Sequence, residues 1–214
     1  MTGWWYRDSW PWPLWQGGVH RLPPACGSSL LLTFDDGPSE NSLRVSSLLA
    51  ERDLKAVFFL QGERAAEHPE RVRELIAAGH RIGSHGLRHV RHGRLSPARV
   101  TLELTQARQL LEHLSGQSVP WFRPPYGSWA PWLHGALAGA GQRAIFWNLN
   151  PKDHAVTAAA PLIDRVLQHA RPADILLLHC TGRGAAHTLA ALPGLLDGLE
   201  SRGIALADPF TTEL

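Results

Sequence analysis

Residues 30–38 have the sequence Leu-Leu-Leu-Thr-Phe-Asp-Asp-Gly-Pro, and this stretch organises the interpretation of the whole chain. Three leucines, a threonine and a phenylalanine predict a buried strand, which Gly37 and Pro38 bring to an end. Two adjacent carboxylates, Asp35 and Asp36, therefore stand at the carboxyl end of that strand. Bare like charges there would repel each other and resist desolvation, whereas a bound cation would remove that objection. The competing interpretation is an exposed Asp-Gly-Pro turn, which is a common structure.

Length and composition limit the classes of protein to which the chain can belong. The sequence has 214 residues and a net charge of +2, so it fits one domain and gives no electrostatic reason to expect a nucleic-acid partner. Its two cysteines, Cys26 and Cys180, are far apart and indicate neither a thiolate zinc site nor a disulfide framework. Twelve histidines make imidazole the better metal ligand to look for. No apolar run reaches the roughly 18 residues that a membrane-spanning helix needs.

The N-terminal segment, residues 1–28, differs from the rest of the chain. Five tryptophans and two prolines crowd into its first fifteen positions, without the basic start and apolar centre of a signal peptide. Three interpretations are open: a hydrophobic clasp on the body, a peripheral contact with a membrane interface, and a set of rings that stack on sugars. We favour the clasp, with residues 29–214 as the domain that carries the chemistry. The sequence leaves the compartment unknown, with a cytoplasmic or peripherally membrane-associated protein as the expectation.

Strand patterns alternate with helical patterns after the first strand. Further strands are expected at residues 56–60, 81–83, 121–123, 143–149, 174–179 and 204–206. Helices are expected at residues 41–52, 69–78, 96–114, 130–140, 160–170 and 187–201. This alternation predicts an α/β fold with a parallel sheet, either open or closed. No repeat or second domain boundary is visible.

Polar side chains that suit catalysis fall at or just after the carboxyl ends of these strands. They are Asp35, Asp36, His85, Arg123, Asp153 and His179. Parallel α/β folds build their active sites at that edge. His85 and His89 are four residues apart, so a helix or tight turn would let both share a metal with Asp36 and leave a position open for water. A chance pair is the competing interpretation, since His80 and His92 lie nearby.

Two further features carry possible chemistry. His179 ends an apolar strand, where a role in acid–base catalysis competes with that of a satisfied core residue. Cys180 follows it, but neighbours on an extended chain point to opposite faces, which argues against a Cys–His nucleophile. Residues 123–127, Arg-Pro-Pro-Tyr-Gly, form a stiff turn that can hold Arg123 beside a carboxylate and aim a backbone N–H at an oxyanion. Here the competing interpretation is a proline-rich surface loop.

Together these motifs resemble the polysaccharide deacetylase (NodB-homology) family, carbohydrate esterase family four. Five motifs stand in the order of that family: Thr-Phe-Asp-Asp-Gly-Pro at 33–38, Ser-His-Gly-Leu-Arg-His at 84–89, Arg-Pro-Pro-Tyr-Gly at 123–127, Asn-Pro-Lys-Asp-His at 150–154 and Leu-Leu-His at 177–179. The resemblance covers residues 30–206 and leaves the N-terminal segment uncovered. It implies a distorted (β/α) barrel of seven or eight strands.

The resemblance also implies a role for each matching residue of the catalytic centre. Asp35 would be the catalytic base, Arg123 would orient Asp35, and Asp153 would hold Arg123. One divalent metal ion, usually Zn²⁺ with Co²⁺ or another divalent ion as alternatives, would be bound by Asp36, His85 and His89. His179 would be the general acid.

Other matching residues would form the substrate side of the site. The N–H of Tyr126 would help to form the oxyanion hole, and Leu177 would line the pocket for the acetyl methyl group. His154 stands where the family usually has a tryptophan beside that pocket, while Asn150 replaces a usual Asp and Ser84 a usual Asn. None of these three departures is a metal ligand or the base, so they bear on substrate preference. His154 should make the pocket wetter and broader.

We therefore expect a metal-dependent hydrolase that removes N-acetyl or related acyl groups from an amino sugar or N-acetylated glycan. Two alternatives remain open: a hydrolase of non-sugar amides or formyl groups on the same scaffold, and a non-catalytic glycan-binding protein. The presence of both Asp35 and His179 argues against the second, since a binding module needs neither. The expected partner is the glycan substrate.

Overall fold

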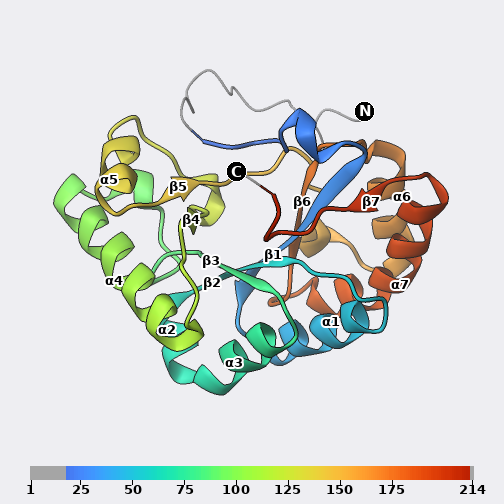
Figure 1. The fold of residues 1–214 in the computed structure, drawn as a ribbon, viewed down its shortest axis with the longest axis horizontal. Coiled ribbons are helices and arrows are strands. Elements are labelled where there is room, and N and C mark those ends of the chain that lie inside the picture. Colours follow the sequence, from blue (N-terminus) through green and yellow to red (C-terminus); the bar gives the residue numbers. More distant parts are fainter. Residues whose placement is uncertain (1–17, 213–214) are drawn as a thin grey trace.

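The computed structural model describes residues 18–212, which form a parallel sheet that curves into a barrel with helices outside it (Figure 1). The strands are β1 (Ser29–Gly37), β2 (Val57–Leu60), β3 (Arg81–Ser84), β4 (Trp121–Phe122), β5 (Arg143–Ala144), β6 (Ile175–His179) and β7 (Ala205–Leu206). Their order is β5-β4-β3-β2-β1-β6, and β7 pairs with the first residues of β1. All these pairings are parallel, so the carboxyl ends of the strands meet at one end of the barrel. The predicted fold class is confirmed.

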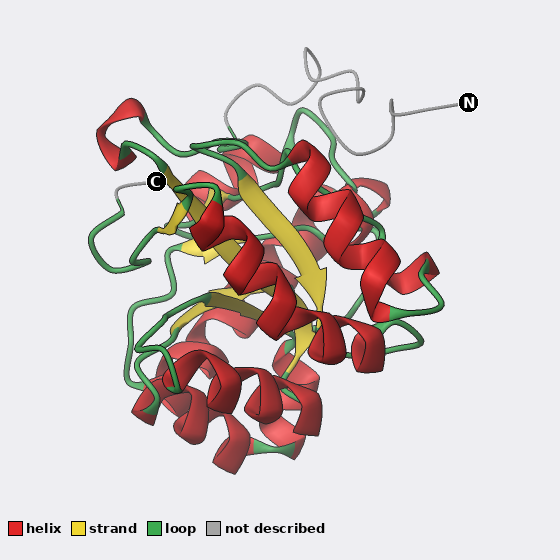
Figure 2. Ribbon diagram, turned by 90° about the vertical axis from the view of Figure 1, so that its right-hand side faces the viewer, coloured by secondary structure: helices red, strands yellow, loops and turns green. Residues whose placement is uncertain are grey.

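Helices surround the strands and cover the outer face of the sheet (Figures 1 and 2). They are α1 (Glu40–Ala50), α2 (Gly62–Glu67), α3 (Pro69–Ala77), α4 (Pro97–Ser115), α5 (Leu133–Gly139), α6 (Ala159–His169) and α7 (Ala185–Ser201). The hydroxyl of Ser96 caps α4 by accepting the N–H of Arg99, as its sequence predicts. The sequence pattern missed α2, because six residues are too few to show a helical period. Within residues 18–212, no helix is long and apolar enough to span a membrane.

The apolar core lies on both faces of the sheet. Leu32 and Phe34 of β1 belong to the larger cluster, which packs between the sheet and the helices. Leu31 belongs to a second cluster that fills one end of the barrel interior. Because side chains alternate along a strand, the next inward residues after Leu31 are Thr33 and Asp35. The apolar filling of the barrel therefore gives way to polar groups as β1 nears its carboxyl end.

The barrel closes irregularly between β5 and β6. The chain after β5 runs on beside β6, where Leu149 forms a single bridge to Leu176. The sequence predicted one strand over residues 143–149, and that strand was too long. The carbonyl oxygens of Ile145 and Phe146 instead accept hydrogen bonds from the buried side chain of Arg123, at 3.0 and 2.8 Å. Both carbonyls therefore bond to a side chain where a regular strand would bond to the backbone of its neighbour.

Residues that precede β1 pack between β5 and β6, where the barrel closes irregularly. Val19 forms a parallel bridge to Ile145, and Arg21 forms an antiparallel bridge to Asp174 just before β6. Leu22 is buried in the inner cluster. Part of the N-terminal segment thus packs on the body. The five tryptophans fall within residues 1–17, outside the described residues, so the clasp interpretation and the domain boundary stay predictions.

Candidate active site

The two adjacent carboxylates of β1 both reach the carboxyl end of the barrel because the strand is irregular there. Alternation alone would point Asp35 and Asp36 to opposite faces. The register between β1 and β2 shifts between Asp35 and Gly37, and Asp36 has a left-handed φ of 72°. This bulge turns the extra residue, so that a carboxylate oxygen of Asp35 and one of Asp36 lie 3.9 and 3.5 Å from the same atom, His85 Nε2. Such strain in a non-glycine residue is typical of functional sites.

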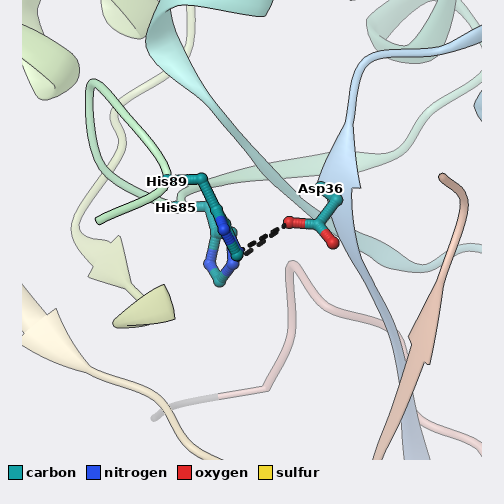
Figure 3. A group of neighbouring side chains, drawn as sticks. All are labelled: Asp36, His85 and His89. Atoms are coloured by element: carbon teal, nitrogen blue, oxygen red, sulfur yellow. Dashed lines mark ion pairs between the residues drawn. The ribbon is translucent and has the colours of Figure 1, made fainter. Parts of the chain in front are cut away.

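Asp36, His85 and His89 form a compact group at this end of the barrel (Figure 3). His89 Nε2 lies 3.1 Å and His85 Nε2 lies 3.5 Å from the same oxygen, Asp36 Oδ1. Burial opposes a charge on Asp36, but the hydrogen bond with His89 and the nearby imidazoles hold its pKa below the usual range. Gln61, which follows β2, donates a further hydrogen bond to the same oxygen at 3.0 Å.

The proton position inferred for His85 fits a cation bound between it and Asp36. Nδ1 of the buried His85 lies 2.8 Å from the carbonyl oxygen of Arg123, so Nδ1 carries the proton. Burial lowers the pKa of His85, which keeps the ring neutral and leaves a lone pair on Nε2 facing Asp36. A lone pair beside a carboxylate is unfavourable unless a cation lies between them. Two atoms that bind one zinc ion tetrahedrally lie about 3.4 Å apart, which matches the 3.1 and 3.5 Å separations here.

Asp35 is held from inside the barrel by Arg123. Nη1 of Arg123 donates to Asp35 Oδ1 at 2.8 Å and to the hydroxyl of Thr33 at 2.7 Å. The guanidinium is fully buried and lies 4.0 Å from the centre of the Phe59 ring. Because this contact uses Oδ1, the second oxygen of Asp35 is the one that borders the His85 imidazole.

Asp153 contacts a different partner from the one that the family resemblance implied. We expected it to hold Arg123, but its two oxygens accept hydrogen bonds from the Nδ1 and the backbone N–H of His179, both at 2.7 Å. The hydroxyl of Thr188 in α7 and the N–H of His154 also donate to it, at 2.9 and 3.0 Å. These four donors fill the acceptor sites of a buried carboxylate. Asp153 therefore has no acceptor site left for Arg123, and the expectation that it holds Arg123 was wrong.

This contact changes the acidity of His179. Burial disfavours a charge on the imidazole, but the hydrogen bond and charge of Asp153, together with the charges of Asp35 and Asp36, raise the pKa of His179 to about 9. Asp153, His154 and His179 are also close enough together to suggest a second metal group. Because four donors already saturate Asp153, we interpret this group as a proton-transfer pair instead.

Tyr126 lies in the short turn Pro125–Gly127 with a left-handed backbone, φ 60°. The backbone N–H of Tyr126 donates to no other group within residues 18–212. Its ring contacts His89 edge-on, with 4.5 Å between the ring centres. Among the described residues, the turn therefore leaves this N–H available as a donor and places the Tyr126 ring against His89.

Leu177 and His154, the two remaining candidates, differ in burial. Leu177 is the register partner of Thr33, so it lies on the inward face of β6 and is buried. The side chain of His154 is 57% exposed, and its ring stands edge-on to that of His179 at 5.7 Å between centres. His154 thus borders the mouth of the site and not its interior.

Sequence reasoning missed two residues that support this site. Gln61 could have been found, because it is a polar residue directly after a predicted strand, as the other candidates are. Thr188 had no such signal, because it is an ordinary polar residue inside a predicted helix.

Comparison with known proteins gives three findings. The sequence matches the Polysaccharide deacetylase family over residues 23–145. It is 34% identical over 192 residues to a chitooligosaccharide deacetylase of Azorhizobium caulinodans, covering 84% of this chain and 91% of that protein. A family 4 carbohydrate esterase from Streptomyces lividans, solved in complex with acetate, has a TM-score of 0.79 and 28% identity over 85% of this chain and 93% of its own.

A further solved structure shows that this fold also occurs without activity. A CE4 family pseudoenzyme from Bacillus anthracis has a TM-score of 0.81 and 25% identity, and the match covers 88% of this chain and 66% of that one. The fold therefore does not decide function, and the side chains of the site must carry that argument.

Proposed function

This chain belongs to the polysaccharide deacetylase family, and we propose that it is a metal-dependent hydrolase that removes N-acetyl groups from an amino sugar or N-acetylated glycan. Relatives named as chitooligosaccharide and peptidoglycan-N-acetylglucosamine deacetylases support a sugar substrate. The observation that carries the metal dependence is the approach of two imidazole Nε2 atoms to one oxygen of Asp36.

In this proposal Asp36, His85 and His89 hold the divalent ion, and zinc suits such nitrogen and oxygen donors. When bound, the ion supplies Lewis-acid activation of the water and of the amide carbonyl. Asp36 would bind the ion through Oδ1, the oxygen that faces both imidazoles and accepts the hydrogen bond from Gln61.

The protein's own groups then divide the proton transfers. Asp35, held at Oδ1 by Arg123, accepts the proton of the attacking water on its other oxygen. The Tyr126 N–H donates to the carbonyl oxygen as that atom gains negative charge, a contribution of about 3 kcal/mol for one such donor. His179, whose Nδ1 is engaged by Asp153, gives a proton from Nε2 to the leaving amine. An amide nitrogen leaves poorly without that proton.

The proposal is tested by acetate release. The purified full chain is stripped of metal with a chelator and incubated with chitin oligomers, peptidoglycan fragments or acetylated lipid-linked sugars, with and without added zinc. We expect zinc-dependent acetate release from at least one of these glycans. Failure with all three by the zinc-loaded chain contradicts the proposal, and hydrolysis of small amides or formamides alone would move it to the non-sugar alternative.

The Asp35→Asn variant tests the assignment of the base. It should keep its metal and lose about 10²- to 10⁴-fold in turnover, the usual contribution of a general base. Because Asp35 also neutralises the buried Arg123, the variant should unfold at a lower temperature, so a thermal unfolding curve sets the assay temperature. Turnover of folded Asp35→Asn near the wild-type rate would assign the base to another residue.

A further inference from the structure

The two proposed histidine ligands are held in different ways. His85 directly follows β3, is buried, and has its Nδ1 bonded to the Arg123 carbonyl oxygen. His89 lies in the loop beyond and its side chain is 29% exposed. Within residues 18–212, its Nδ1 makes no hydrogen bond. Metal-binding histidines are usually oriented through their second nitrogen, so another part of the structure must orient His89.

Backbone hydrogen bonds fix one side of this loop. The N–H groups of Gly62 and Glu63, at the start of α2, donate to the carbonyl oxygens of Gly86 and Leu87, both at 2.9 Å. These bonds anchor the first half of the loop, residues 85–87. They do not reach His89.

The side chain next to His89 is anchored on a different helix. Nε of Arg88 donates to Oε1 of Glu103 in α4 at 3.1 Å, and Nη2 of Arg88 makes a second, short contact to the same oxygen. The Glu103 side chain is only 1% exposed, whereas that of Arg88 is 39% exposed. Arg99, one turn earlier on α4, lies 3.5 Å from the same oxygen.

Glu103 is an unusual residue for its place in the helix. Its neighbours on the buried face of α4 are apolar, among them Val100, Leu104 and Ala107. A buried ion pair is often no more stabilising than apolar residues of the same size, so stability is a weak reason for a carboxylate here. Its clear effect is geometric, because two donors of one guanidinium are held on one fixed oxygen.

We propose that Glu103 is a positioning residue of the metal centre, which acts through Arg88 to hold the second half of the ligand loop and so to place His89. The inference rests on the proposed metal site. It adds α4, which contributes no ligand, to the elements that determine metal affinity.

The test measures metal affinity, which does not depend on turnover. Zinc affinity of the full chain is measured by competition with a chelator dye, and the visible spectrum of the Co²⁺ form reports the ligand set. We expect Glu103→Gln to weaken zinc binding by about 10- to 100-fold, the usual effect of losing an outer-shell partner, and to change the Co²⁺ spectrum. Arg88→Lys keeps the charge that neutralises Glu103 but loses the two-point contact, and should weaken binding in the same direction.

Glu112→Gln is the matched control. Glu112 lies on the same helix and pairs with Arg108 at 3.0 Å, but it is near the other end of α4. This variant should bind zinc as the wild type does. Wild-type affinity and spectrum in both Glu103→Gln and Arg88→Lys would overturn the inference while leaving the metal site intact. Absence of zinc binding by the wild type would instead overturn the proposed function, and the inference with it.

Discussion

The site contains two groups of the same composition, one aspartate and two histidines. The two groups differ in how their carboxylates are hydrogen-bonded. Around Asp153, four donors point at one carboxylate, and His179 is left with a single nitrogen to exchange a proton. Around Asp36, two imidazole nitrogens face one carboxylate oxygen, and the proton of His85 is engaged elsewhere, by the Arg123 carbonyl. The first arrangement surrounds its carboxylate with donors, whereas the second brings the unprotonated Nε2 of His85 up to a carboxylate oxygen.

This difference shows that residue types alone do not define a metal centre. Both groups satisfy the distances that a metal would need. Only the Asp36 group leaves an unprotonated nitrogen, His85 Nε2, facing its carboxylate, whereas the Asp153 group is complete without a cation. For His85 and His179, the acceptor bonded to Nδ1 therefore decides the chemistry of Nε2.

The largest expected effect comes from breaking the Asp36 group. Asp36→Ala should lose the bound metal and at least ~10³-fold in turnover, because Lewis-acid activation is worth several kcal/mol. Metal content is measured by elemental analysis after dialysis. Asp153→Ala is the comparison variant and should retain full metal occupancy. Equal occupancy in wild type and Asp36→Ala would place the ion elsewhere, and metal loss in Asp153→Ala would remove the distinction between the two groups.

A smaller effect is expected when the Asp153 group loses its charge. In Asp153→Asn, burial acts on His179 without the opposing carboxylate, so the pKa of His179 should fall from its raised value of about 9. A general acid works in its protonated form, which exists below its pKa. The alkaline limb of the rate profile should therefore move to lower pH, with about 10²-fold lost at pH 8 and less at pH 6.

The measurement is kcat against pH for zinc-loaded wild type and Asp153→Asn. A bound cation affects the pKa of His179 equally in both proteins. The difference between the two pH profiles is therefore the informative quantity. An unshifted alkaline limb in Asp153→Asn would show that His179 is not the acid.

The smallest effect concerns His154, at the exposed edge of the Asp153 group. A tryptophan there would make a wider apolar wall, so His154→Trp should shift preference toward plain N-acetylglucosamine oligomers over more polar or bulkier acylated substrates. Apolar walls discriminate weakly, so we expect a change of about 10-fold or less in the ratio of the two kcat/KM values. Metal content should not change.

His113→Trp is the control for this substitution, because His113 is exposed and lies in the last turn of α4. That variant should leave the ratio of kcat/KM values unaltered. The same ratio in wild type and His154→Trp would show that His154 does not line the substrate pocket.

The amino-acid pattern alone was enough to establish the fold class and the end of the barrel where the polar residues meet. Alternating helix and strand patterns require parallel strands, and parallel strands end together. Asp35, His85 and His179 could therefore be placed near one another before any contact was known. Their motifs also identified the family, which the sequence match confirms.

Only the tertiary structure decided which groups pair. Asp153 lies 26 positions from His179 and Arg123 lies 88 from Asp35 in the chain, and neither distance indicates a partner. The bulge at Asp36, the shortened β5 and the link from Glu103 to the ligand loop depend on contacts of the same kind. A sequence pattern reports spacing along one element and the face that it buries. It does not report which side chain lies across the barrel, because that depends on how separate elements pack.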